Sequence, residues 1–447
     1  MSGGLPRYVQ HRAHLALRVA AAALAAVLLS VAAPVAAQTQ PDGSGSSANP
    51  GDPADGPRVR FTFDKHPSIH VRKLFELDVR VKSQTDWRDF PSGPGTVPKN
   101  VFDLHRARVG IEGTLLMRFD YQIEREFHDT TRPWRDVYMD ARVLRDLQIQ
   151  GGHFKIPFGL DQLTSGMDLD FSYRSLAGTY LAPGRDVGLM AHGRLFTDVV
   201  KYQAGVFRQG GENVRASERT EAQSDRTVAA RVVVKPWSGL RTRRSLRSFA
   251  AGIAFTDGRL PEGRNSLRGK TVPGDAFFEP VYVKGGRQRV GAEFQWRPGP
   301  MSVQAEVMRA RDQRHGQGID NENLPDAVAR GWYVSSTWLV TGERKKDTVK
   351  PARPFLKGGI GAVELAGRVE SLSSGNKGST GVSFAGPRAP WILGMTDNVW
   401  TTGVNWYVNE FIKLQADLIR EQREAGGIII PAQGRLWSRT LRVQFAL

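Results

Sequence analysis

The feature that most constrains this chain is an alternation of apolar and polar residues that begins near residue 72 and runs to the C-terminus. In the segment 72–82 (RKLFELDVRVK), apolar side chains at every second position share one face, and charged side chains share the other. This period of two predicts a β-strand with one polar face. The pattern recurs in 116–124, 289–296 and 411–419, and no sustained helical period follows residue 37. We therefore expect an all-β fold.

About sixteen alternating segments can be counted, and long and short connections alternate between them. Short turns are expected at Gly113 and Thr114, near Arg145, at Thr197 and Asp198, at 297–300, and at Asn409 and Glu410. Two connections that should also be short turns, 237–247 and 342–358, are longer. An even number of antiparallel strands with one short-turn end and one long-loop end is typical of a transmembrane antiparallel β-barrel of the outer membrane. A soluble sandwich would show similar alternation, but it would not predict this order of connections.

The N-terminal segment 1–37 has the features of a signal peptide. Arg7, Arg12 and Arg18 precede an unbroken apolar run at 19–29, and small residues at 35 and 37 prepare cleavage before Gln38. A membrane anchor would need a longer uninterrupted apolar stretch. We expect a flexible periplasmic leader over 38–71, whose first part is rich in Gly, Ser, Pro and Asp, and a barrel domain over 72–447. The chain has no Cys, which excludes disulfides and thiolate chemistry.

Several segments together resemble the phosphate-selective porin O/P family of Gram-negative outer-membrane porins. They are LHRARVGIEGTL (104–115), HFKIPFGLDQLTS (153–165), SVQAEVMRAR (302–311), GWYVSSTWLVTGE (331–343), GAVELAGRVESL (361–372) and TTGVNWYVNEFIKLQAD (401–417). The resemblance implies a trimer of sixteen-stranded barrels in the outer membrane, with lipid and lipopolysaccharide around it. Each barrel would pass phosphate, polyphosphate or other small anions by diffusion, with the third long loop narrowing the pore. It implies neither an enzyme nor a cofactor.

The candidate anion path follows from the same resemblance. The third long loop and its borders supply Lys155, Arg174 and Arg185, and the segment LHRAR supplies Arg106 and Arg108. The fifth long loop resembles an arginine-rich loop that collects anions at the mouth, and it supplies Arg259, Arg264, Arg268 and Lys270. Arginine suits this role because its planar guanidinium binds phosphate oxygens in pairs and keeps its charge. Each of these cations could instead be a solvated loop residue or a lipopolysaccharide contact.

Three residues depart from the family pattern. Gln150 and Gln162 stand where phosphate-specific relatives place lysines, and His105 stands where the first arginine of a pair is common. The inward faces of the expected strands also carry almost as many acids as bases. We therefore expect an anion-preferring porin rather than a phosphate-specific one. A general porin, or a barrel acting as a surface adhesin or structural protein, is the alternative.

Other motifs were set aside. GRNSLRGKT (263–271) lacks the spacing and the strand-to-helix context of a phosphate-binding loop. His66 and His70 have no acidic partners in a metal-ligand pattern, so no metal is expected. The net charge of +17 would suit a nucleic-acid ligand, but the signal peptide and the barrel pattern exclude that partner.

Overall fold

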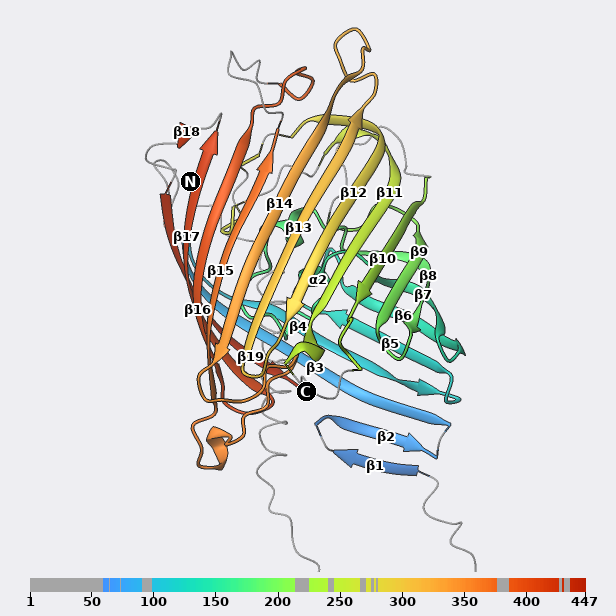
Figure 1. Cartoon of the computed structure of the whole chain (residues 1–447), viewed down its shortest axis with the longest axis vertical. Helices are drawn as coiled ribbons and strands as arrows, with labels where there is room; N and C mark the ends of the chain where they lie inside the picture. The colour runs from blue at the N-terminus through green and yellow to red at the C-terminus, as the bar shows by residue number, and fades with distance from the viewer. Residues whose placement is uncertain are drawn as a thin grey trace, which may run out of the picture. The chain divides into compact units, whose positions relative to one another are not determined.

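The computed structural model of the chain describes residues 59–63, 65–72, 74–90, 99–213, 225–239, 245–265, 271–274, 277–278, 280–375, 386–425, 428–429 and 435–447. All of them belong to one compact unit, Pro57–Leu447. Its sixteen long antiparallel strands form a closed barrel (Figure 1). They are β3 (Phe75–Phe90), β4 (Lys99–Leu115), β5 (Phe119–Glu126), β6 (Trp134–Leu144), β7 (Leu147–Lys155), β8 (Arg185–Leu195), β9 (Val200–Phe207), β10 (Thr227–Val234), β11 (Ala250–Arg264), β12 (Tyr282–Trp296), β13 (Met301–Arg314), β14 (Leu324–Leu339), β15 (Ala362–Ser374), β16 (Met395–Tyr407), β17 (Ile412–Ala425) and β19 (Arg435–Ala446).

Each of these strands pairs with its neighbour in sequence, and the last strand closes the barrel by pairing with the first. The closing register runs from Arg439 opposite Asp89 to Ala446 opposite Lys82. The short strand β18 (Ile428–Ile429) adds to one end of β17. Every segment that alternates in the sequence lies in one of the sixteen barrel strands, so the predicted all-β barrel is confirmed.

One predicted turn is wrong. Gly113 lies inside β4, and the chain reverses at Leu116 and Met117, which both have positive φ. Gly113 is needed for close packing instead, since a Cβ there would lie 1.9 Å from the carbonyl oxygen of Glu76 on the neighbouring strand. Glycine in a strand often marks such an approach rather than a turn.

The strands are polar toward the inside and apolar toward the outside. On β15, Glu364 and Arg368 are buried inside the barrel, whereas Leu365 and Val369 are 44% and 40% exposed on its outer surface. This is the reverse of a soluble protein, and it fits a wall with lipid outside and water inside. Among the described residues, no helix combines the length and the apolar character needed to cross a bilayer.

Two short strands precede the barrel. β1 (Val59–Phe63) and β2 (Pro67–Val71) form a hairpin, and β2 pairs with the first residues of β3. These strands lie in the segment 38–71 that the sequence analysis assigned to a flexible leader, so for 59–71 that assignment needs correction. The reason is that β3 begins at Phe75, before β19 reaches it at Lys82, and β2 fills the free edge. The described residues do not include 1–58, where the signal peptide is predicted.

The connection 156–184 between β7 and β8, here called the inner loop, folds into the barrel. It contains two short helices, α2 (Leu160–Leu163) and α3 (Leu176–Tyr180). Its apolar side chains form the main hydrophobic core with the inner wall, where Phe158 and Leu181 pack in one cluster with Met308 and Leu372. The core of the molecule is therefore the contact between this loop and one part of the wall.

Buried carboxylates of the wall hold the backbone of the inner loop. Glu306 on β13 accepts hydrogen bonds from the backbone N–H groups of Leu160 and Asp161 at 2.5 and 2.8 Å. Glu370 on β15 accepts the N–H of Leu176 at 2.5 Å, and these bonds satisfy the free N–H groups at the starts of both helices. These hydrogen bonds from buried side chains of the wall anchor the loop to β13 and β15.

Further along the inner loop, the wall also binds its backbone carbonyls. Lys413 on β17 donates to the carbonyls of Met167 and Leu169 at 3.1 and 2.9 Å. Asp417 accepts the N–H of Ser172 at 2.7 Å. The loop is thus bonded to the wall from β13 round to β17.

The close approach of α3 to the wall depends on Gly331 in β14. A Cβ at this position would lie 2.8 Å from the Cβ of Ala177, closer than real contacts allow. We predict that Gly331→Ala lowers the free energy of unfolding by about 1–3 kcal/mol, because α3 must shift. Gly367 on β15 is the matched control, since a Cβ there meets nothing within 4 Å.

Urea unfolding of both variants in lipid vesicles measures the difference. Gly367→Ala should stay within about 0.5 kcal/mol of the parent. Equal stabilities for the two variants would show that α3 does not pack on the wall as described.

Candidate functional site: a basic cavity beside the inner loop

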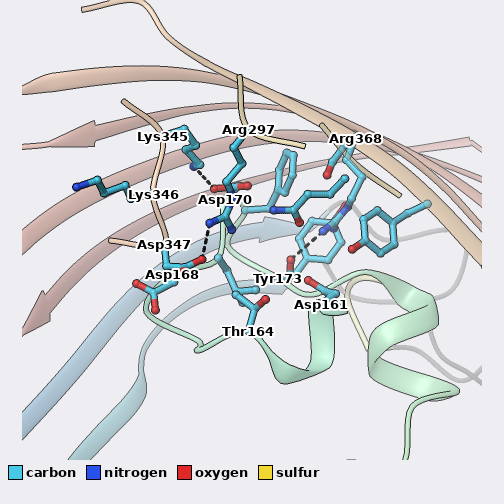
Figure 2. Close-up of a pocket in the computed structure, with 15 residues that line it drawn as sticks. Asp161, Thr164, Asp168, Asp170, Tyr173, Arg297, Lys345, Lys346, Asp347 and Arg368 are labelled. Atoms are coloured by element: carbon cyan, nitrogen blue, oxygen red, sulfur yellow. Dashed lines mark hydrogen bonds and ion pairs between the residues drawn. The ribbon is translucent and has the colours of Figure 1, made fainter. Parts of the chain in front are cut away.

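The inner loop leaves very different spaces on its two sides. Toward β12–β15 the remaining cavity measures about 20 Å³, which is room for about one water molecule (Figure 2). Toward β4–β8 it leaves a cavity of about 490 Å³, here called the constriction cavity. Its lining residues are Lys82, Arg106, Arg108, Gln122, Glu124, Arg132, Arg135, Asp136, Tyr138, Gln150, Phe154, Lys155, Gln162, Leu163, Ser165, Gly166, Arg174, Thr179, Arg185, Met190, Gln203, Glu212 and Asn213. Of these two cavities, the one on the β4–β8 side is therefore by far the larger.

The constriction cavity is strongly basic. Its lining carries eight Lys and Arg side chains against three carboxylates, a net formal charge of +5. Charges of one sign gathered in a narrow passage focus the field on a passing ion, so they outweigh a wall that is balanced overall. The segregation of charge that an anion preference needs is present here.

Three of these cations have no ion pair with a carboxylate among the described residues. Arg106 donates to the side-chain oxygen of Gln84 at 2.9 Å, and Lys155 donates to the carbonyls of Leu163 and Thr164, both at 3.0 Å. Arg174 donates to the carbonyl of Thr164 at 2.6 Å and to that of Asp161. Carbonyl and amide oxygens orient these cations without cancelling their charge, so the charge stays available to an anion.

Arg174 lies in the inner loop itself, and its surroundings act on its pKa in both directions. Burial lowers the pKa of the guanidinium below its ordinary value. Asp161 opposes this shift, while Arg185 and Arg108 add to it. An arginine keeps its proton even so, and a lowered pKa reports a cation that would gain from an anion beside it.

The other predicted cations of this site are paired with acids. Arg108 donates to Glu126 at 2.7 Å and to Glu124 at 3.0 Å. Arg185 binds Asp136 with two nitrogens at 3.1 and 2.8 Å. These pairs are largely buried, so they stiffen the wall and contribute less net field than Arg106, Lys155 and Arg174.

The structure therefore brings together five of the nine predicted site residues, Arg106, Arg108, Lys155, Arg174 and Arg185. It places Arg259 elsewhere: this side chain is exposed and lies in the outward phase of β11, between Gly258 and the buried Leu260. Arg264 stacks its guanidinium over Tyr282, with 5.9 Å to the ring centre, outside the constriction cavity. Arg268 and Lys270 lie outside the described residues. β11 continues to Arg264, so the part of the expected fifth long loop that contains Arg259 belongs to the barrel wall.

Three further cations line the cavity but were not among the predicted site residues: Lys82, which was expected to face inward, and Arg132 and Arg135. Lys82 forms an ion pair with Glu124, and Arg135 donates to Asp129 at 2.9 Å. The sequence could have identified Arg132 and Arg135 as candidates, because both lie at the long-loop end of a strand that is close in sequence to the inner loop. Gln150 and Gln162, the two departures from the family pattern, do line the cavity.

A second cavity of about 540 Å³ continues from the first toward the short-turn end. Lys82 and Ser165 line both cavities, so the two meet at these residues. The second cavity reaches His66 of the N-terminal hairpin and Leu447 at the end of the chain. Residues of β3 and β4 line both cavities, which together extend past the inner loop.

Comparison with known proteins agrees with this geometry. A family model described as phosphate-selective porin O and P matches residues 75–425. The chain belongs to this family. It is 27% identical over 397 residues to Porin O of Pseudomonas aeruginosa, which covers 79% of this chain and 84% of that protein.

Solved structures support the fold alone. OmpT of Vibrio cholerae superposes with a TM-score of 0.52 at 11% identity, covering 83% of this chain and 98% of that one. The outer-membrane channel DcaP of Acinetobacter baumannii gives a TM-score of 0.51 at 9% identity, covering 84% and 98%. The porin is a Gram-negative outer-membrane β-barrel channel rather than an enzyme, and the resemblance found in the sequence is confirmed. In this setting the long-loop end is extracellular and the short-turn end is periplasmic.

We predict that Arg106→Gln and Arg174→Gln each lower the ratio of anion to cation permeability. A unit charge at about 4 Å contributes about 1 kcal/mol in water, so each change should reduce the ratio roughly fivefold. Arg259→Gln makes the same charge change outside the barrel and serves as the control. Reversal potentials across planar bilayers in a KCl gradient measure all three.

This account of the site would be contradicted by an equal loss of selectivity in Arg259→Gln. It would also be contradicted if both cavity variants kept the parent's ratio.

Proposed function

We propose that the porin conducts small anions in preference to cations. The single observation that carries this proposal is the set of Arg106, Lys155 and Arg174 in the constriction cavity. Each is held by neutral oxygens and forms no ion pair with an acid in the part of the chain that the structure describes. A partly hydrated anion passing between β4–β8 and the inner loop would replace lost water by contacts with these donors. A potassium ion would meet a net positive lining without a comparable row of unpaired carboxylates.

Phosphate or polyphosphate is the finer part of the proposal. The family description, phosphate-selective porin O and P, supports phosphate as one substrate. Gln150 and Gln162, however, present neutral amides in the constriction cavity. Each missing cation removes one charge-assisted contact to a phosphate oxygen, so phosphate would bind weakly and pass with other small anions.

The test uses single-channel chloride current with inorganic phosphate added as a competing anion. The parent channel should be anion-selective and should need high phosphate for block. Gln150→Lys and Gln162→Lys should each lower the half-blocking phosphate concentration about fivefold, because one cation is added beside the path. Gln288→Lys on β12, outside the constriction cavity, is the matched control.

A cation-selective parent channel would overturn the anion proposal. Anion selectivity without any effect of the two lysine variants on phosphate block would overturn only the assignment of the phosphate path to this cavity.

We also propose that three copies assemble. Structural neighbours with a similar barrel include a trimer form of OmpT. The outer surface here has an apolar hollow of about 660 Å³ on β3, β4, β16, β17 and β19, with Trp87, Phe102 and Trp406 in its lining. Native mass spectrometry of detergent-solubilised protein should give the trimer mass, and Phe102→Arg should shift it toward the monomer; a monomeric parent would contradict the proposal.

A further inference from the structure

The connection 340–361 between β14 and β15 is unusually long for the periplasmic end, and part of it folds back into the barrel. There it meets the inner loop in the small closed cavity described above (Figure 2). Lys345 lies at this meeting point with only 3% of its side chain exposed, whereas the next residue, Lys346, is exposed and points away from Asp170. A buried lysine in a connection that should face the periplasm needs an explanation.

Lys345 joins three parts of the molecule. Its ammonium forms an ion pair with Asp170 of the inner loop and a second one, at 2.5 Å, with Glu364 of β15. Its backbone N–H donates to the carbonyl of Gly299, in the turn between β12 and β13, at 2.8 Å. One residue therefore connects the inner loop to the barrel wall through its side chain and to a periplasmic turn through its backbone.

The surrounding contacts complete this link. Asn405 donates to the carbonyl of Asp170 at 2.8 Å and to Glu364 at 3.1 Å, and Tyr407 donates to Glu364 at 2.7 Å. Thr348 donates to Asp168, also in the inner loop, at 3.2 Å. These neutral donors support the carboxylates, but Lys345 supplies the cation that both of them contact.

We propose that Lys345 is a positioning residue that latches the inner loop to the wall and so keeps the passage on its other side open. The proposal rests on the channel function but not on which ion the channel prefers. Without the ammonium, Asp170 and Glu364 would both lose the cation that they contact. Breaking a buried ion pair on one side leaves an uncompensated charge, so the loop segment around Asp170 would move away from the wall and into the lumen.

The ionisation of Lys345 supports this role. Burial alone would lower its pKa, but Asp170 and Glu364 outweigh that effect and raise the pKa above its ordinary value. The ammonium therefore keeps its charge across neutral pH. The latch is permanent rather than pH-switched in that range.

A second cation, Lys413, also holds the inner loop near Asp170, but it binds neutral groups. Lys413 donates to the carbonyls of Met167 and Leu169, which remain neutral if it is removed. Gln444 also donates to the carbonyl of Met167, at 2.8 Å. Loss of Lys413 thus leaves a second donor in place, whereas no other cation among the described residues forms an ion pair with Asp170 or Glu364.

The experiment compares Lys345→Met with Lys346→Met in single-channel recordings of the full-length porin in symmetrical KCl. Both changes remove one positive charge from the same connection, but only Lys345 contacts the inner loop. We expect Lys345→Met to raise the fraction of time spent in closed or partly closed states at least about tenfold. Lys346→Met should gate like the parent, and Lys345→Arg, which keeps the charge, should lie close to the parent.

The same closed fraction in Lys345→Met and the parent would overturn the latch. So would an equal rise in Lys346→Met, because that would show an effect of charge at the mouth rather than of loop position. If Lys345→Met does not insert, Lys345→Met/Asp170→Asn/Glu364→Gln removes the buried charges together, and parent-like gating there, with normal heat-modifiability, would also overturn the proposal. Gating in symmetrical KCl does not depend on anion preference, so the latch and the proposed selectivity can fail separately.

Discussion

The attachment of the inner loop to one half of the barrel wall decides how the rest of this porin works. A sixteen-stranded barrel by itself encloses a wide aqueous lumen. Here Glu306 and Glu370 bind the starts of two short helices, and an apolar cluster around Phe158 and Met308 fills the space between loop and wall. The larger free space therefore lies on the other side of the inner loop, where the lining is basic, and we propose that ions pass there.

This division also explains how a nearly balanced wall can favour anions. Several acids that face inward serve as anchors: Glu306 and Glu370 bind the inner loop, and Glu364 binds Lys345. The cations that remain without acidic partners, such as Arg106 and Lys155, lie on the open side. The net charge of the wall does not determine the ion preference, because the position of each charge relative to the inner loop determines whether a passing ion meets it.

The sequence predicted the barrel well because the two-residue period is a local property. The alternation of each strand is contained in that strand's own sequence. The order of long and short connections follows directly from antiparallel pairing. The same locality explains the errors. Gly113 looked like a turn because its close contact with Glu76 comes from a neighbouring strand, and Arg259 looked like part of a loop because β11 extends past the point where its alternation fades.

The site was predictable only in part, and largely through the family resemblance. Arg106, Lys155 and Arg174 were identified as candidates, but alternation cannot show which cations lack an acidic partner. It also cannot show which side of the barrel the inner loop binds, because that depends on contacts between residues more than a hundred positions apart, such as Leu160 with Glu306. No pattern in the sequence pointed to Lys345, because Asp170 is far from it in sequence and Glu364 lies in a regular strand.

The central claim is that ions pass between the inner loop and the β4–β8 wall. The chain contains no native Cys, so single cysteines can report on water access without a background signal. Gln150→Cys would lie in the constriction cavity, and Ser335→Cys would lie in the small closed cavity behind the loop. The measurement is the rate at which anionic and cationic methanethiosulfonates change the channel current of each variant. The account predicts fast modification and partial block of Gln150→Cys, faster with the anionic reagent, and little reaction at Ser335→Cys. Rapid block through Ser335→Cys with an unreactive Gln150→Cys would contradict it.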